Sequence, residues 1–514
     1  MRELDRRTIE EYGTPGEVLM DRAGHGLAEH IHRLAGEAGL YAPLIRMVAG
    51  RGNNGGDAFV AARYLHTAGF DVDVLLAGTV EDIQGDARTH LRHMQNMEIP
   101  LRERPAPDHW KEELNAGREP ADILVDGVLG TGTTGPARGP AAAAIDYMNA
   151  CAHQAFIVSI DIPSGLDADH GHAEGSVVRA DMTVTMGLPK IGLALADGIE
   201  YSGSVEVVDI GIPAEYIDEL ETEYAAIGDA DLWPCFPRRK RVSHKGDYGH
   251  VLLIGGARGY SGAIALAGQA ALRSGCGLVS ILTPESIVTP VSCHAAEFMV
   301  HGIAETGAGS ISAHGWSEWK DRIHEFDAIL IGPGMTRHDD TLQITRQIIQ
   351  TSRKPLVLDA DAIQVLHGRP HELKEASCPI VITPHPGEFA RLGDLNVTDV
   401  QADRIGMARA MAQTTNTTVV LKGAGSIIAR SGQPVHINLT GNPGMATGGT
   451  GDVLAGLLTG LLAQNLDPFD AARFSVYIHG RAADLLAWDM TQRGYTAGDI
   501  VTRLPDVFRD VLLR

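Results

Sequence analysis

Along residues 1–210, short apolar runs alternate with longer segments whose apolar positions recur at helical spacing. Apolar runs of about four to eight residues indicate buried strands, whereas a period of about 3.6 residues indicates amphipathic helices. Their alternation predicts a doubly wound, mostly parallel sheet in a Rossmann-like three-layer α/β sandwich. The expected strands are residues 44–49, 72–77, 123–126, 155–160, 182–185 and 205–208, and the expected helices are residues 57–67, 83–97 and 141–152.

The pattern breaks over residues 211–241 and then restarts. The interruption contains the acidic stretch GIPAEYIDELETEY, two prolines in DLWPCFPRR and the basic run RRKR, which together indicate an interdomain connection. We therefore expect two domains, residues 1–222 and 223–514, the second also of the α/β class. Its expected strands are residues 251–254, 277–282, 328–331, 356–359, 380–383 and 418–421, and its two long helices are residues 451–464 and 470–490.

Composition limits the class of protein. The 514 residues include 43 Lys plus Arg and 65 Asp plus Glu, a formal net charge of −22, so we expect no nucleic-acid partner. The opening MRELDRRTIEEYG is too polar for a signal peptide, and no apolar run approaches the roughly 18 residues that a membrane helix needs. The five cysteines are scattered, with no Cys-x-x-Cys pair to suggest zinc. These features predict a soluble cytoplasmic protein without a membrane partner.

A glycine-rich loop, GRGNNGGD at residues 50–57, follows the first expected strand. Glycines let backbone N–H groups approach a phosphate, and a following helix adds its positive N-terminal end. On the glycines alone, a plain flexible turn is an equal alternative. The polar side chains of Asn53, Asn54 and Asp57 favour a binding site, because flexibility alone does not require them.

Two further loops follow expected strands, VDGVLGTGTTGP at residues 125–136 and SIDIPSGLDAD at residues 159–169. The carboxyl ends of parallel strands meet at one edge of a sheet, so Asp126 and Asp161 are expected to face one cleft. Carboxylates in such positions are catalytic, bound to a metal or hydrogen-bonded to neighbouring amides. The residues alone leave these alternatives open.

The segment NPGMATGGTGDVLAGLLTG at residues 442–460 indicates phosphoryl transfer. Glycines that lead directly into a helix bring unpaired amides and the helix dipole to one point, where they would stabilise a phosphoryl group. Asp452, in the first turn, would either cap the helix or accept a proton from an attacking hydroxyl. No Gly-Lys dipeptide occurs, which excludes a Walker-type loop. Lys422, in LKGAGSII at residues 421–428, is the expected contact to nucleotide phosphate.

The loops of the first half, together with LMDRAG at residues 19–24, resemble the epimerase domain of the NAD(P)H-hydrate repair enzymes over residues 1–215. The resemblance implies Asp161 as the acid/base group and a potassium ion among Asn54, Asp126 and Ser164, whose oxygen atoms suit a hard cation. Some relatives have a lysine where Thr134 stands, so the proton partner of Asp161 stays open. The implied substrate-binding residues are Asn53, Asn54, Gly55, Gly56, Asp57, Gly130, Thr131, Gly132, Thr133, Thr134, Gly135 and Pro136.

The second half, from residue 242 on, resembles the ribokinase-like dehydratase half of the same enzymes. The resemblance is carried by KGDYGHVLLIGGARGYSGA (245–263), IGPGM (331–335), LDADA (358–362), PHPGE (384–388), LKGAGS and GGTGD. It implies substrate contacts from Ala263, Gly334, His385 and the catalytic Asp452. Read alone, His385 is more typical of a structural loop histidine, but its place in PHPGE favours binding. The implied nucleotide-binding residues are Lys422, Gly423, Ala424, Gly425, Ser426, Gly448, Gly449, Thr450 and Gly451.

Together the two resemblances imply a bifunctional NAD(P)H-hydrate repair enzyme. The first domain would interconvert the R and S epimers of hydrated NADH and NADPH (NADHX and NADPHX). The second would dehydrate the S epimer with ADP, or ATP, as phosphoryl donor and magnesium at the phosphates, and ADP would leave AMP and phosphate. We also expect a homo-oligomer. The alternative is a ribokinase-like small-molecule kinase, which leaves a stable phosphorylated product, fused to a dinucleotide-binding sensor domain.

Overall fold

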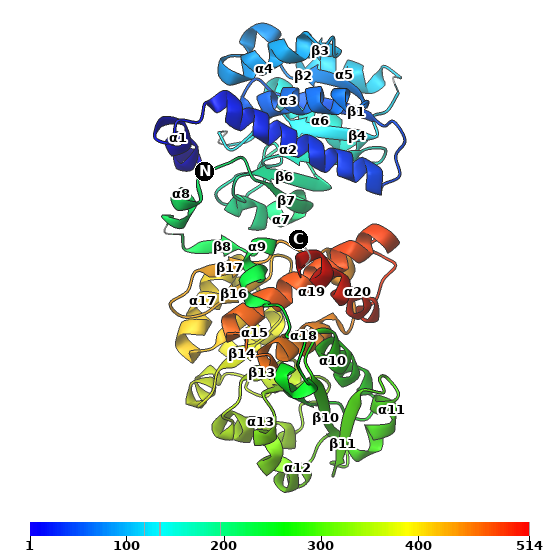
Figure 1. Cartoon of the computed structure of the whole chain (residues 1–514), viewed down its shortest axis with the longest axis vertical. Coiled ribbons are helices and arrows are strands. Elements are labelled where there is room, and N and C mark those ends of the chain that lie inside the picture. The colour runs from blue at the N-terminus through cyan, green and yellow to red at the C-terminus, as the bar shows by residue number, and fades with distance from the viewer. Residues whose placement is uncertain (118, 133–134, 196, 221, 513–514) are drawn as a thin grey trace. The chain divides into compact units, whose positions relative to one another are not determined.

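The computed structural model describes residues 1–117, 119–132, 135–195, 197–220 and 222–512. The chain forms two compact units, Met1–Glu221 and Thr222–Arg514, which run from blue to green and from green to red in Figure 1. Each unit contains its own sheet and its own hydrophobic cores.

The sheet of the first unit has the strand order β3-β2-β1-β4-β5-β6-β7, and all neighbouring strands are parallel. This confirms the doubly wound arrangement that the hydrophobic pattern predicts. The order reverses between β1 and β4, which leaves a crevice at the carboxyl edge of the sheet. The strands are β1 (Leu44–Ala49), β2 (Asp71–Leu76), β3 (Leu101–Glu103), β4 (Ile123–Gly127), β5 (Phe156–Ile160), β6 (Met182–Met186) and β7 (Ser204–Val208).

Helices cover both faces of this sheet. Side chains alternate between the faces of a strand, so Met47 packs with α2, α3 and α4, whereas Val48 packs with α5 and α6. The unit is therefore the predicted three-layer sandwich. Its helices are α1 (Arg2–Glu10), α2 (Gly16–Glu37), α3 (Asn53–Thr67), α4 (Gly85–Gln95), α5 (Pro107–Asn115), α6 (Gly139–Cys151), α7 (Gly198–Tyr201) and α8 (Ala214–Asp218).

The sheet of the second unit has the order β11-β10-β9-β12-β13-β14-β15-β16-β17-β8. Its strands are parallel from β11 to β15, β16 and β17 continue antiparallel, and β8 pairs in parallel with β17. Here the order reverses between β9 and β12. The strands are β8 (Tyr224–Ala226), β9 (His250–Ile254), β10 (Leu278–Pro284), β11 (Phe298–Ile303), β12 (Ala328–Ile331), β13 (Leu356–Leu358), β14 (Ile380–Ile382), β15 (Thr418–Leu421), β16 (Ile427–Ala429) and β17 (Val435–Ile437).

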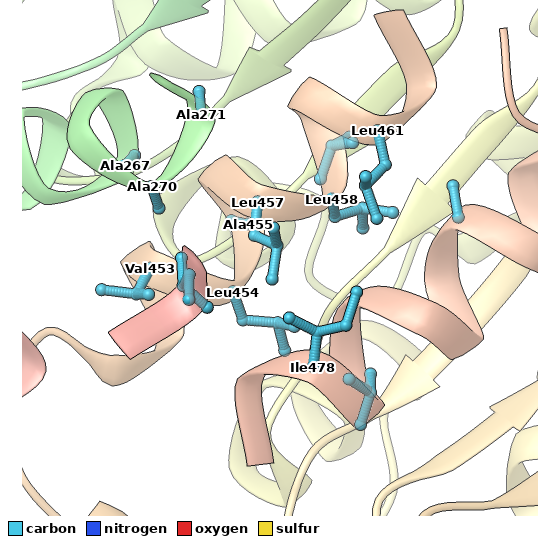
Figure 2. Close-up of a cluster of buried hydrophobic side chains, with 14 of the residues drawn as sticks. Ala267, Ala270, Ala271, Val453, Leu454, Ala455, Leu457, Leu458, Leu461 and Ile478 are labelled. Carbon is cyan, nitrogen blue, oxygen red and sulfur yellow. The ribbon is translucent and has the colours of Figure 1, made fainter. Parts of the chain in front are cut away.

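One face of this sheet is covered by α10, α18, α19 and α20, and the other by α12, α13, α15 and α17. Figure 2 shows the apolar side chains of α18 packed between the alanines of α10 and Ile478 of α19. The helices are α9 (Asp229–Leu232), α10 (Ser261–Arg273), α11 (Val288–Ser292), α12 (Ala313–Trp319), α13 (Asp339–Thr351), α14 (Asp361–Gln364), α15 (Pro386–Gly393), α16 (Val397–Ala402), α17 (Arg404–Thr415), α18 (Thr450–Ala463), α19 (Pro468–Met490) and α20 (Ala497–Leu512).

One expectation about local structure is wrong, and another is incomplete. Helix α3 begins at Asn53 rather than at residue 57, so NNGG forms the first helical turn instead of a loop. Asn and Gly have low helix propensity, which concealed this start. The boundary between the units does lie within residues 211–241, as expected, but the segment is not without structure, because α8 belongs to the first unit, and β8 and α9 to the second, where Leu232 is 1% exposed. Elements of three to five residues are too short to show a hydrophobic period.

The hydrophobic pattern also failed to predict several elements. Strands β3, β16 and β17 have three residues each, and β11 is only half-buried, so none carries a clear apolar run. Helix α20 contains Pro505, which weakens a helix prediction. Within the described ranges, no helix combines the length and the apolar character needed to cross a membrane.

Candidate functional sites

In the first unit, the loops after β1 and β4 leave the sheet where its strand order reverses. The Gly50 N–H donates to the Gly127 carbonyl (2.8 Å), and a Cβ at Gly50 would lie 1.9 Å from the Val128 carbonyl oxygen. A Cβ at Gly55 would lie 2.0 Å from the Gly50 carbonyl oxygen. Glycine is therefore required at both positions for the two loops and the start of α3 to meet in the crevice.

Asn54 connects the loops that follow β4 and β5. Its Nδ2 donates to the carbonyl oxygens of Leu129 (3.1 Å) and Ile160 (2.8 Å). Its Oδ1 lies beside Gly130, where a Cβ would come within 2.3 Å of it. Asn53, by contrast, is exposed at the start of α3. The predicted cradle residues Asn54 and Gly130 are thus brought together, with the Asn54 carboxamide oxygen on the side of the glycine loop.

Asp126 is fully buried at the end of β4. Its carboxylate accepts four hydrogen bonds, from Ser159 Oγ (2.8 Å), Ser164 N (2.8 Å), Ser164 Oγ (2.5 Å) and Val128 N (3.3 Å). The sequence left open whether Asp126 is catalytic, bound to a metal or hydrogen-bonded to its neighbours. In this structure it is hydrogen-bonded to its neighbours. Ser164 Oγ also accepts from Leu129 N (2.8 Å), and Asn54 donates to the Leu129 carbonyl, so Asn54 and Ser164 meet at Leu129 while Asp126 is connected to them through Ser164.

Asp161 follows β5 and has φ +66°, an unfavourable backbone conformation for a residue other than glycine. Its Oδ1 accepts hydrogen bonds from Lys190 Nζ, Met186 N (3.1 Å) and Thr185 Oγ1 (3.3 Å). Lys190 is 9% exposed and also donates to the Met186 carbonyl (2.8 Å). Lys190 was not predicted from the sequence, although LPK lies just after an expected strand and Lys190 is one of only eight lysines.

Asp57 lies near this pair and is 8% exposed. Burial, and then the charge of Asp161, raise the pKa of Asp57 well above its ordinary value, although Lys190 opposes the shift. Asp57 therefore keeps its proton to a higher pH than an exposed carboxyl group does. Of the predicted glycine-loop residues, Gly132, Gly135 and Pro136 are exposed and Thr131 is half-buried, while Thr133 and Thr134 lie outside the described residues.

In the second unit, the GGTGD turn starts α18. Gly449 caps the helix with φ +94°, and Thr450 Oγ1 donates to the Met445 and Thr447 carbonyls (3.2 Å each). Gly448 is exposed, and a Cβ there would meet no atom within 4 Å. The turn is therefore open at Gly448, and an open turn ahead of a helix is what the phosphoryl-transfer hypothesis requires.

A buried cluster of charges lies beside this turn. Lys422 Nζ donates to Asp359 Oδ1 (2.8 Å) and lies 3.9 Å from Glu388 Oε2, while Thr383 Oγ1 also donates to Asp359 Oδ1 (2.8 Å). A Cβ at Gly451 would lie 3.2 Å from Lys422 Nζ, so the ammonium is adjacent to the first turn of α18. Burial opposes the charged form, but the carboxylates of Asp359 and Glu388 raise the pKa of Lys422.

Asp452 lies in the same electrostatic environment. Burial, and then the charge of Asp359, raise its pKa to about 7, against the opposing effect of Lys422. A carboxyl group with a pKa near neutrality suits general base catalysis, because it accepts and releases protons at the working pH. Asp359 and Glu388 were given no role from the sequence, although both lie in the quoted motifs LDADA and PHPGE.

His385 is the N-cap of α15. Its ring Nδ1 accepts hydrogen bonds from the backbone N–H groups of Gly387 (3.0 Å) and Glu388 (3.3 Å). The backbone N–H of His385 in turn donates to Glu388 Oε2 (2.9 Å). This is the structural role that the sequence left open, and it orients Glu388 toward Lys422. The His385 side chain is 55% exposed. Its ring therefore has an accessible side in addition to the capping nitrogen.

Ala263 and Gly334 lie together beyond the ends of β9 and β12, the two neighbouring strands between which the strand order reverses. Gly334 has φ +66°, and a Cβ there would lie 2.8 Å from the Tyr260 carbonyl oxygen and 3.3 Å from Ala263 Cβ. The Gly256 N–H donates to the Pro333 carbonyl (2.8 Å), which holds the two loops against each other. These predicted substrate contacts therefore share the crevice at the point of strand reversal.

Arg404 supports the predicted nucleotide loop. Its guanidinium donates to the carbonyls of Leu421 (3.3 Å) and Lys422 (3.3 Å), and also to that of Ala424. Within the loop, Ser426 Oγ donates to the Gly423 carbonyl (2.9 Å). Arg404 lies outside every motif, so the sequence offered no indication of this role.

His479, on α19, contacts the Thr450 residue of the GGTGD turn. It is 5% exposed, and its ring hydrogen-bonds to the Thr450 backbone. Burial, and then the charge of Lys422, lower the pKa of His479 to about 4, so the imidazole is neutral near pH 7. His479 was not predicted either, because in the sequence it is one more position in a long helix.

Comparison with known proteins assigns both halves. Residues 251–506 match the family described as NAD(P)H-hydrate dehydratase, and residues 16–192 match the family described as YjeF-related protein N-terminus. The bifunctional NAD(P)H-hydrate repair enzyme Nnr of Moorella thermoacetica is 40% identical over 512 residues, which cover 99% of this chain and 96% of that protein. The Escherichia coli K12 enzyme of the same name is 35% identical and covers 89% of this chain and 84% of that protein.

Solved structures resemble the second unit. The ADP/ATP-dependent NAD(P)H-hydrate dehydratase of Bacillus subtilis, co-crystallised with ATP and Mg²⁺, has a TM-score of 0.50 and 32% identity, and the match covers 55% of this chain and 97% of that one. A ribokinase-like superfamily protein of Enterococcus faecalis has the same TM-score with 28% identity, over 57% of this chain and 99% of that one. With near-complete coverage of a 40% identical relative, this chain belongs to the family of bifunctional NAD(P)H-hydrate repair enzymes.

Proposed function

We propose that this chain repairs hydrated NADH and NADPH by two activities. The unit Met1–Glu221 interconverts the R and S epimers of the hydrates, and the unit Thr222–Arg514 dehydrates the S epimer with a nucleotide as phosphoryl donor. Family membership supports both activities. The observation that carries the proposal is the position of Asp452, a carboxyl group with a pKa of about 7, in the first turn of α18 beside the Lys422 ammonium.

Dehydration needs a better leaving group than hydroxide. Asp452 accepts the proton of the substrate hydroxyl as its oxygen attacks the terminal phosphoryl group, so an O–P bond forms and the phosphoanhydride bond breaks. Lys422 and the amides of the GGTGD turn stabilise the negative charge that develops. Phosphate then leaves the ring carbon as the ring nitrogen donates its electron pair, and loss of a proton from the adjacent carbon restores the reduced nicotinamide.

We propose ADP as the phosphoryl donor, with AMP and phosphate as its products, and ATP as the alternative donor. Asp359, Glu388 and Asp452 surround the single ammonium of Lys422, an excess of negative charge that fits a magnesium ion carried in with the nucleotide. Such an ion would supply positive charge at the phosphates. The described residues form no cluster of three or more His, Cys, Asp or Glu side chains arranged for a metal, so phosphates would supply most ligands.

In the first unit, Asp161 is the proposed acid/base group, and it moves a proton at the ring carbon that bears the hydroxyl. Lys190, which donates to Asp161, is the proposed proton partner in place of the residue at position 134. Asn54, Asp126 and Ser164 bring carboxamide, carboxylate and hydroxyl oxygens to the loop after β4, and oxygen ligands suit potassium. To hold the ion, Asp126 and Ser164 would exchange some of their hydrogen bonds to each other and to neighbouring residues for bonds to potassium. A potassium ion there would supply a fixed positive charge beside the substrate.

The test is to incubate the protein with a mixture of NADH hydrate epimers and ADP or ATP, and to follow reduced-nicotinamide absorbance and inorganic phosphate. We expect complete conversion of both epimers. Asp161→Asn should consume the S epimer and abolish exchange, whereas Asp452→Ala should retain exchange and lose roughly 10²- to 10⁴-fold in dehydration rate.

Three outcomes would contradict parts of this proposal. A stable phosphorylated product without recovered absorbance would instead identify a small-molecule kinase. Exchange that persists in Asp161→Asn would remove Asp161 from the epimerase mechanism. Near-normal dehydration by Asp452→Ala would remove Asp452 as the base.

A further inference from the structure

Arg404 binds three backbone carbonyls of the predicted nucleotide loop. Its Nη2 donates to the carbonyls of Leu421 and Lys422 (3.3 Å each), and its Nη1 donates to the carbonyl of Ala424. A Cβ at Gly423 would lie 2.8 Å from Nη2, so the loop comes close to the guanidinium at a residue without a side chain. The guanidinium therefore holds the loop on both sides of Gly423.

The position of Arg404 is unfavourable for a cation. Arg404 is the first residue of α17, where the free amides of a helix give a partial positive charge. The residue is half-buried, burial lowers the pKa of its guanidinium, and its Nε is buried without a hydrogen-bond partner among the described residues. No carboxylate contributes to the pKa shift, and the ion pairs between described residues do not include Arg404. This cation has lost water without gaining a carboxylate, which fits an anion that binds nearby.

The bonds to Arg404 also determine where an amide of the loop points. The peptide bonds are trans, and in a planar trans peptide the carbonyl and the following N–H point in opposite directions. The Ala424 carbonyl faces the guanidinium, so the Gly425 N–H points away from it. Within the part of the chain that the structure describes, no residue accepts a hydrogen bond from this N–H. The Gly425 N–H is therefore available to a ligand.

The same loop reaches the phosphoryl-transfer turn. The Lys422 N–H donates to the Pro384 carbonyl (2.9 Å), which fixes the start of the loop after β15. The Lys422 ammonium lies next to the first turn of α18, where a Cβ at Gly451 would come within 3.2 Å of it. The loop that Arg404 holds therefore carries both an available amide and the ammonium that lies beside the GGTGD turn.

We propose that Arg404 is a positioning residue for the nucleotide, because it holds the loop carbonyls so that the Gly425 amide and the Lys422 ammonium meet a phosphate group. This inference rests on the proposed nucleotide-dependent dehydration by the second unit. The charge of Arg404, which pairs with no described carboxylate, adds an attraction for the anion across the loop. Arg404 acts through the loop and makes no chemical step of its own.

The test is the nucleotide dependence of dehydration in the full chain, with S-hydrate in excess and ADP or ATP, whichever the unmodified protein uses. Arg404→Met keeps a long side chain and removes the charge and the donors. The KM for the nucleotide should rise by about 10- to 100-fold, since hydrogen bonds from a charged donor are lost. The kcat and the KM for S-hydrate should change little. Calorimetric titration with nucleotide and Mg²⁺, without S-hydrate, should show the same loss of affinity.

The matched control is Arg409→Met. Arg409 lies on the same helix, where it forms an ion pair with Glu223 (3.1 Å). The substitution removes the same charge from α17, but the ion-pair partner of Arg409 is outside the nucleotide loop. The KM for the nucleotide should therefore equal that of the unmodified protein.

Arg404→Lys covers the case in which Arg404→Met does not fold. It keeps the charge, but one ammonium replaces the two guanidinium nitrogens that hold the loop, so the KM for the nucleotide should rise here too. An unchanged KM in either folded variant would overturn the inference, as would a loss of kcat alone in proportion to the folded fraction. Absence of nucleotide-dependent dehydration by the unmodified protein would instead overturn the proposed function, so the two failures are distinguishable.

Discussion

Each site is built around one buried lysine that is outnumbered by carboxyl groups. Lys190 donates to Asp161, and Lys422 donates to Asp359 while Asp452 lies nearby. A buried carboxyl that is repelled by its neighbours keeps its proton to higher pH, whereas a buried ammonium is stabilised by them. The pKa of Asp57 in the first site and the pKa values of Asp452 and Lys422 in the second are raised in this way, and the pKa of Asp452, about 7, suits acid/base chemistry near neutral pH.

The pKa of Asp452 predicts the pH dependence of dehydration. Only the carboxylate form accepts the hydroxyl proton, so the rate should rise as pH increases through about 7 and become constant above it. The measurement is the pH–rate profile of reduced-nicotinamide recovery with S-hydrate and saturating nucleotide. A rate that is constant from pH 5 to 9, a span of about two units on either side of neutrality, would contradict Asp452 as the base.

Two variants test the cause of this shift. Asp359 supplies the largest charge contribution to the raised pKa of Asp452, so Asp359→Asn should move the rise to lower pH. Asp499 also lies in the first turn of a helix, α20, where its Oδ2 accepts a hydrogen bond from the Thr496 N–H (2.8 Å), and it is not among the largest charges that shift the pKa of Asp452. Asp499→Asn should leave the profile unchanged and serves as the matched control.

At the scale of elements, the position of the phosphoryl-transfer turn depends on how closely α18 approaches α10. A Cβ at Gly456 would lie 2.0 Å from the Ala267 carbonyl oxygen, and a Cβ at Gly460 would lie 2.1 Å from Ser274 Oγ. The neighbouring contacts are alanines against leucines, as Figure 2 shows. Small residues at the contact let the two helices lie close. Because Asp452 is one turn from this contact, the contact determines where Asp452 lies relative to the rest of the site.

Enlarging Gly456 should disturb both stability and dehydration. Gly456→Val forces α18 away from α10, which should destabilise the second unit by about 1–3 kcal/mol. It should also displace Asp452, which lies one helical turn before Gly456. The measurement is the temperature of half-inactivation of dehydration, with epimer exchange as an internal reference that should not change.

The matched control for this prediction is in the partner helix. A Cβ added at Gly262, in α10, would meet no atom within 4 Å, so Gly262→Ala should retain the thermal stability of the unmodified protein. Equal half-inactivation temperatures for Gly456→Val and Gly262→Ala would show that the close contact between the helices is not required.

At the scale of the whole molecule, each unit closes its own sheet with helices on both faces. A solved dehydratase chain matches the second unit over 97% of its length, so a chain of this size folds without an epimerase half in that protein. In the proposed reaction only the S epimer is dehydrated, so an epimerase fused to the dehydratase would allow both epimers to be recovered.

Separation of the units is therefore expected to preserve both activities. Residues 1–221 expressed alone should exchange the epimers, and residues 222–514 alone should dehydrate only the S epimer and stop at partial conversion. Mixing the two fragments should restore complete conversion, which is measured by the absorbance of the reduced nicotinamide. Inactive fragments from an active full chain would contradict independent units, and full conversion by residues 222–514 alone would contradict the division of labour.

The hydrophobic pattern predicted much of the architecture because strand and helix periods are local properties. The strands at 44–49, 328–331 and 418–421 have the expected bounds, and the long helices α18 and α19 differ from expectation by one or two residues at their ends. Asn53 at the start of α3 and the short strand β8 were not predictable in this way, since low propensity and short length remove the period.

By itself the sequence determined the doubly wound class, the glycine loops at strand ends and the GGTGD turn, which follow from composition and spacing within a few residues. The acid/base role of Asp161 was implied by the family resemblance, and the roles of Asp161 and Asp452 stay predictions. Only the tertiary structure brought Lys190 to Asp161 across 29 positions, and Lys422 to Asp359 across 63. Burial and the charges of distant residues shift pKa values, and neither quantity is defined until the chain has folded.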